Sequence, residues 1–179
     1  MITLFARIKQ WIVSLFSTPV IVPPVPIHPP VPAPAPVQKT LTPELYTKSK
    51  SLIRQRLRLD KSVPDTLACA TALSYVIHKV KFTAISKYGI SGTNALLDWF
   101  LSHPELYKQR ANPTPGCIIL SPTGHGNGKI RGHVGIEGNN SIMSNNSKTG
   151  LWDTHWDSQR WYDYYTVYGG IKTYYFELL

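Results

Sequence analysis

The stretch that decides the fold reads Val63-Pro64-Asp65-Thr66-Leu67-Ala68-Cys69-Ala70-Thr71-Ala72-Leu73. Pro64 ends whatever element precedes it, and Asp65 or Thr66 can cap a helix that begins there. Apolar residues then recur at helical spacing as far as Ile77. Cys69 is therefore expected near a helix N-terminus, where unpaired backbone N–H groups and the helix dipole favour an anion and lower the pKa of a thiol.

A second informative stretch begins at His133 and reads His-Val-Gly-Ile-Glu, an apolar, strand-like run that follows a glycine-rich loop. An imidazole close to a thiol is a further means of activating it as a nucleophile. A third polar group is needed to orient the imidazole, and Asn145 or Asn146, after the next apolar run, can supply it. Consecutive strand residues point to opposite faces, so only one of the two can serve.

A thiol on a helix, then a histidine on a strand, then a polar residue on the next strand is the order found in papain-like peptidoglycan hydrolases. On this order, the chain resembles the CHAP and NlpC/P60 families over about residues 60–179. Cys117 stands where those families commonly carry the acidic residue of a Pro-Gly-Asp strand start. The residues that carry the resemblance are Asp65 to Tyr75, Pro115 to Leu120, Gly132 to Ile136 and Gly138 to Asn146.

The resemblance implies an α+β, papain-like NlpC/P60-CHAP fold, with N-terminal helices packed on a small antiparallel sheet. It also implies hydrolysis of amide bonds in bacterial cell-wall peptidoglycan, by an N-acetylmuramoyl-L-alanine amidase or a peptide-crosslink endopeptidase. A phage endolysin and a wall-remodelling enzyme both fit this description.

Matched position by position, the resemblance makes Cys69 the nucleophile and His133 the base. It favours Asn145 as the orienting residue, with Asn146 as its substitute. The backbone N–H of Cys69 is the expected oxyanion donor, with support from Asp65 or Thr66. This chemistry needs no metal and no cofactor.

Other interpretations stay open at this point. One alternative is a non-catalytic wall-binding or assembly module in which Cys69 is structural, and another is a thioester-forming acyltransferase that acts on lipid. A Cys69–Cys117 disulfide would silence the thiol, but Cys117 has the pattern of a buried strand residue. A zinc site from Cys69, His125 and His133 lacks the spacing of zinc motifs. Residues 124–129 lack the Gly-Lys-Ser/Thr ending of a phosphate-binding loop.

With 179 residues, the chain has room for one domain of ordinary size and an appendage. Its formal charge of +9 suits a polyanionic partner such as teichoic acid or anionic lipid. No nucleic-acid-binding motif accompanies the charge, so nucleic acid is not an expected partner.

The chain divides into three segments. Residues 1–17 are apolar and predict an amphipathic helix that binds a membrane surface or a partner protein, because the run is too short and too charged to span a bilayer. Residues 18–39 are rich in proline, which forbids helix and ladder pairing, and predict an extended linker. Residues 40–179 are the expected catalytic domain. This layout favours a protein that is membrane-associated or exported toward the cell wall, or part of a phage virion or lysis apparatus.

Within the last segment, the pattern predicts helices before strands, which is typical of α+β folds. We expect one helix from Thr42 to about Leu59, the Cys69 helix to about Lys81, and a third over residues 94–102 with Thr93 as its cap. Aromatic residues between 151 and 165 either cover the sheet or stack on sugar rings. The predicted β-prone runs are 117–121, 133–137, 141–145 and 172–178.

Overall fold

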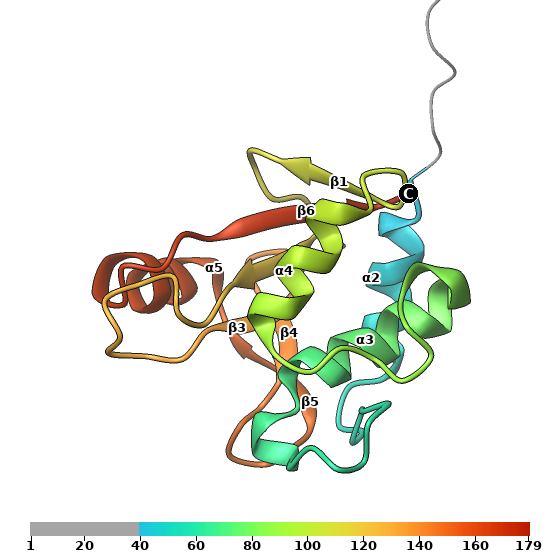
Figure 1. Ribbon diagram of the computed structural model, residues 1–179, viewed down its shortest axis with the longest axis horizontal. Coiled ribbons are helices and arrows are strands. Elements are labelled where there is room, and N and C mark those ends of the chain that lie inside the picture. Colours follow the sequence, from blue (N-terminus) through green and yellow to red (C-terminus); the bar gives the residue numbers. More distant parts are fainter. Residues whose placement is uncertain (1–39) are drawn as a thin grey trace, which may run out of the picture. The chain divides into compact units, whose positions relative to one another are not determined.

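A computed structural model describes residues 40–179, which form a layer of helices packed on an antiparallel sheet (Figure 1). This confirms the predicted α+β class. The predicted helix over residues 1–17 and the linker over residues 18–39 lie outside the described residues. The α-helices are α2 (Thr42–Ser51), α3 (Cys69–Val80), α4 (Thr93–Ser102) and α5 (Ser158–Trp161).

Three helical segments of other types adjoin them. Two 3₁₀ turns, η1 (Asp65–Leu67) and η2 (Phe82–Ala84), lie before and after α3. A π-helical segment, η3 (Tyr162–Tyr168), continues α5. Within residues 40–179, no helix has the length and apolar composition required to cross a bilayer.

The described part of the chain contains six strands in the order β1-β6-β2-β3-β4-β5, and every neighbouring pair is antiparallel. Four of them match the predicted β-prone runs to within two residues at either end. β1 and β5 were not predicted. The bounds are β1 (Tyr107–Arg110), β2 (Ile118–Ser121), β3 (His133–Glu137), β4 (Ile142–Asn145), β5 (Trp152–Trp156) and β6 (Tyr174–Leu178).

Side-chain alternation along the strands divides the core between the two faces of the sheet. On one face, Val134, Ile136 and Met143 pack with side chains from α2, α3 and α4. On the other face, Ile119 and Ile142 pack with a smaller cluster from the chain after β5. That cluster consists of Trp161, Tyr165 and Ile171.

The helix α2 ends at Ser51, well before the predicted end near Leu59. Arg54 has a left-handed backbone conformation with φ of 67°, which no helix can continue. The chain is then held by the start of β5, because the Arg54 N–H donates to the Trp152 carbonyl at 2.8 Å and the Trp152 N–H donates to the Gln55 carbonyl at 2.8 Å. Tertiary hydrogen bonds therefore override the helical pattern of residues 52–59.

The loop between β2 and β3 lies against η3, and Figure 1 shows this loop beside α5, on the left of the view. The Asn127 backbone N–H donates to the Gly169 carbonyl at 2.9 Å, and the Asn127 side-chain amide donates to the Tyr168 carbonyl at 2.8 Å. These bonds hold the glycine-rich loop beside the segment that carries Tyr165.

Candidate functional site

A cleft of about 720 Å³ opens where β3 begins, and both Cys69 and His133 line it. Its walls come from five parts of the chain: η1 with the start of α3, the β2–β3 loop, the β4–β5 loop, β5, and α5 with η3. The thiol and the imidazole belong to opposite sides of the sheet, since Cys69 packs against the core under α2, α3 and α4, whereas His133 contacts the aromatic cluster on the other face. They reach one cleft because Cys69 is the first residue of α3 and His133 the first residue of β3.

Cys69 is half-buried, and its thiol is surrounded by backbone N–H groups rather than by charged side chains. Burial raises the pKa of the Cys69 thiol to about 11, although the backbone N–H groups of Ala70, Cys69 and Val134 act in the opposite direction. Removal from water therefore outweighs the effect of the helix N-terminus on which the sequence prediction rested. The thiol is protonated at neutral pH.

His133 is only 8% exposed, and aromatic rings cover it. The centroid of its ring lies 5.5 Å from that of Trp161 and 6.2 Å from that of Tyr165, with the Tyr165 ring nearly parallel. Burial, together with the smaller effect of the His155 charge, lowers the pKa of His133 to about 3. The imidazole is therefore neutral at neutral pH.

Ser144, not the predicted Asn145, contacts the imidazole. The Nε2 atom of His133 lies 3.1 Å from the Ser144 hydroxyl, and both residues are buried. In the β3–β4 ladder, Gly135 pairs with Ser144, so Ser144 shares the face of Gly135 and His133. Asn145 points to the helix-covered face instead.

The two asparagines have other partners. The Asn145 side-chain amide donates to the backbone carbonyl of Asp65 at 2.8 Å and so connects β4 to the turn before Cys69. Asn146 lines the cleft, and its side-chain oxygen accepts the Lys148 N–H at 3.0 Å. Neither side chain hydrogen bonds the imidazole.

Asp65 and Thr66 lie in η1, the 3₁₀ turn just before α3, and neither side chain caps α3. The Asp65 carboxylate pairs with the guanidinium of Arg56 and, at 3.1 Å, with that of Arg58. Thr66 is exposed and lines the cleft. The Asp65 side chain therefore anchors the turn to the preceding loop, and only Thr66 faces the space where a substrate would lie.

His155 and Tyr165 also line the cleft, although neither was among the predicted catalytic residues. His155, on β5, has its ring centroid 6.2 Å from that of His133, and its buried Nδ1 has no hydrogen-bond partner. The pKa of the Tyr165 hydroxyl is raised by burial and by the charge of the Cys69 thiolate, so the phenol is near the thiol and stays protonated. The aromatic pattern of residues 151–165 was visible in the sequence, but the side on which the chain returns after β5 was not.

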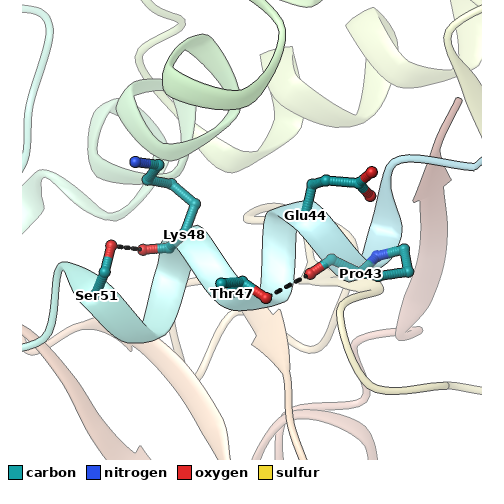
Figure 2. Close-up of a pocket in the computed structure, with 5 residues that line it drawn as sticks. All are labelled: Pro43, Glu44, Thr47, Lys48 and Ser51. Atoms are coloured by element: carbon teal, nitrogen blue, oxygen red, sulfur yellow. Dashed lines mark hydrogen bonds between the residues drawn. The ribbon is translucent and has the colours of Figure 1, made fainter.

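The other candidate sites in the described part of the chain have fewer features of a reactive site. Both cysteines are free thiols, so no Cys69–Cys117 disulfide is present. Among residues 40–179, no group of three or more His, Cys, Asp or Glu side chains is arranged to hold a metal ion. His125 hydrogen bonds Asn94 through Nε2 at 2.7 Å. A groove along α2, lined by Pro43, Glu44, Thr47, Lys48 and Ser51, contains neither thiol nor imidazole (Figure 2).

No protein-family model, curated protein or solved structure matches this chain.

Proposed function

We propose that this chain is a cysteine-dependent hydrolase of amide bonds in bacterial cell-wall peptidoglycan, with a papain-like arrangement of the NlpC/P60-CHAP type. The observation that carries the proposal is the cleft that Cys69 and His133 share, in which Nε2 of the imidazole is hydrogen bonded to Ser144. A thiol, a base and a residue that orients the base are the three parts of a cysteine nucleophile system. Ser144 takes the place that the resemblance gave to Asn145.

The hydrogen bond to Ser144 indicates how the base acts. In the tautomer with the proton on Nε2, the Nε2–H donates a hydrogen bond to the Ser144 hydroxyl oxygen, and Nδ1 has a free electron pair for the thiol proton. Because burial keeps both the thiol and the imidazole neutral, the proton moves during attack and not before it. His133 therefore acts as a general base on Cys69 rather than as half of a preformed ion pair.

The reaction then has two steps. The Cys69 sulfur bonds to the amide carbonyl carbon while Nδ1 of His133 takes the thiol proton, and the backbone N–H of Cys69 donates to the developing oxyanion. Collapse breaks the C–N bond, and the imidazolium returns its proton to the leaving amine, leaving a thioester. Water, deprotonated by His133, attacks the thioester, and the carboxylic acid and the protonated thiol are released.

A second candidate is a non-catalytic wall-binding module on the same fold. It is favoured by the pKa of Cys69, which burial raises to about 11, since a reactive thiol more often has a lowered pKa. On this alternative, the cleft binds wall peptide but cleaves nothing.

The full chain should be tested on purified sacculi of several wall chemotypes, with release of new amino groups as the measurement. The matched variants are Cys69→Ala and Cys117→Ala, since Cys117 is a thiol buried in the core away from the cleft. We expect release by the wild type and by Cys117→Ala, and none by Cys69→Ala with its circular dichroism unchanged. Release by Cys69→Ala would exclude the thiol as nucleophile, and sacculus binding without release by the wild type would favour the binding module.

A further inference from the structure

The rim of the cleft carries charge of one sign. Lys129 and Arg131 come from the β2–β3 loop, Lys148 from the β4–β5 loop and Arg160 from α5. None of the Asp or Glu residues between 40 and 179 lines the cleft. Four cations from three separate segments therefore surround the space beside Cys69.

These cations are not neutralised within the described part of the chain, where the ion pairs join Asp65 to two arginines and Arg110 to Glu177. Aromatic faces hold two of the rim cations instead. The Arg160 guanidinium lies 5.5 Å from the centre of the Trp156 ring, and the Lys129 ammonium lies 5.3 Å from the centre of the Tyr168 ring. Such contacts position a cation without cancelling its charge, so the cleft presents a positive potential to a ligand.

Apolar surface lies between the charges. Trp156 and Tyr164 line the cleft with their ring centroids 5.5 Å apart, and Leu67 and Ile130 also line it. A suitable ligand therefore alternates aliphatic parts with separate anionic groups, as a short acidic peptide does. A polyphosphate favours one continuous cationic track or a nest of backbone N–H groups, whereas these cations stand apart around the opening.

We propose that this cleft binds the free carboxylates of a peptide, so that the enzyme selects amide substrates flanked by carboxylate groups. The position of the scissile amide beside Cys69 rests on the proposed function. The binding of carboxylates does not need the thiol, so the two proposals can fail separately.

The test is calorimetric binding to the full chain carrying Cys69→Ala, which cannot turn the ligand over. The probes are N-acetyl-Ala-Glu-Lys-Ala, which has two free carboxylates, and its diamide, in which both are carboxamides. We expect the diamide to bind at least about tenfold more weakly, and the acidic peptide to lose affinity as the salt concentration rises from about 50 mM to about 300 mM. A glycerol phosphate oligomer, added as a competitor, is expected to displace the peptide poorly.

Variants locate the effect. Because the rim cations are exposed, Arg131→Gln and Lys148→Gln should each weaken binding of the acidic peptide about twofold to fivefold and leave binding of the diamide unchanged. Lys108→Gln is the matched control, since Lys108 is an exposed cation on β1, at the opposite edge of the sheet from β5. Equal affinity for the peptide and its diamide, equal effects of the three variants, or stronger binding of the glycerol phosphate oligomer would each overturn the proposal. Loss of wall hydrolysis with carboxylate binding intact would reject the proposed function alone.

Discussion

Ser144 and Asn145 are neighbours in β4 that serve different parts of the molecule. Ser144 holds the imidazole of His133, whereas Asn145 holds the turn before Cys69. Replacement of Ser144 by Ala should therefore lower kcat about tenfold to a hundredfold with little loss of stability, because the ring loses its orienting partner. Replacement of Asn145 by Ala should cost about 1–2 kcal/mol of unfolding free energy, because a buried hydrogen bond is lost.

Measurement of kcat on a soluble wall peptide and of urea unfolding for both variants separates these effects. If Asn145→Ala gave the larger fall in kcat at unchanged stability, Asn145 rather than Ser144 would orient the base.

The reactivity of Cys69 gives a second residue-scale prediction. Because burial raises its thiol pKa to about 11, alkylation by iodoacetamide at neutral pH should be slower than that of a free cysteine, and the rate should keep rising as the pH approaches 11. Cys117, which is fully buried, should not react in the folded chain. Mass spectrometry of the labelled peptides over a pH series gives both rates. Rapid labelling of Cys69 with an inflection below pH 7 would show a preformed thiolate and reject the general-base mechanism.

Among the elements, the β2–β3 connection places His133. Gly132 precedes His133 at the edge of the cleft, and a Cβ atom there would lie 2.2 Å from the Ser121 carbonyl oxygen and 2.3 Å from the Thr123 nitrogen. Both atoms belong to the backbone, so Gly132→Ala should move β3 against β2 and destabilise the fold by about 2–4 kcal/mol.

Gly128→Ala is the comparison in the same loop. A Cβ atom at Gly128 meets nothing within 4 Å, so its cost comes from the φ of +78° alone and should be about 1–2 kcal/mol. Denaturant unfolding of both variants gives the two costs. Equal losses of unfolding free energy in the two variants would mean that the loop adjusts to the added Cβ and does not fix the position of His133.

The local sequence pattern correctly predicted the helices and strands whose formation depends mainly on the residues within them. The apolar period after Cys69 predicts α3, and the run that begins at His133 predicts β3, because both stretches carry strong periodic signals. The predicted end of α2 was wrong because the true end depends on hydrogen bonds to Trp152, which is distant in the sequence. β1 was missed because three of its four residues are exposed and polar, as suits an edge strand.

The candidate site, like the fold, could be predicted only where local sequence pattern decides it. The thiol and the imidazole follow from residue type and local pattern, but the choice among Ser144, Asn145 and Asn146 depends on strand register, which a single sequence does not fix. The rim cations come from two loops and one helix that only the folded chain brings together.

For the whole molecule, a histidine buried in neutral form makes folding depend on pH. In the unfolded chain His133 has its ordinary pKa of 6.5, whereas in the folded chain its pKa is about 3. Between those values the unfolded state carries more protons, so stability falls as the pH falls. At about pH 5.5 the loss from this residue should be about 1.4 kcal/mol relative to about pH 7.5.

His155 acts in the same direction, since burial also lowers its pKa, whereas burial raises the pKa of Glu137 and gives the opposite trend in more acid solution. A difference measurement isolates His133: urea unfolding of the wild type and of His133→Gln at about pH 7.5 and about pH 5.5. Groups away from His133, such as Glu137, titrate alike in both proteins and cancel, and the part of the His155 contribution that does not depend on His133 cancels too, so the wild type should lose about 1.4 kcal/mol more than the variant. Equal losses would mean that the folded chain protonates His133 readily. The neutral imidazole that the general-base mechanism requires would then be absent in mild acid.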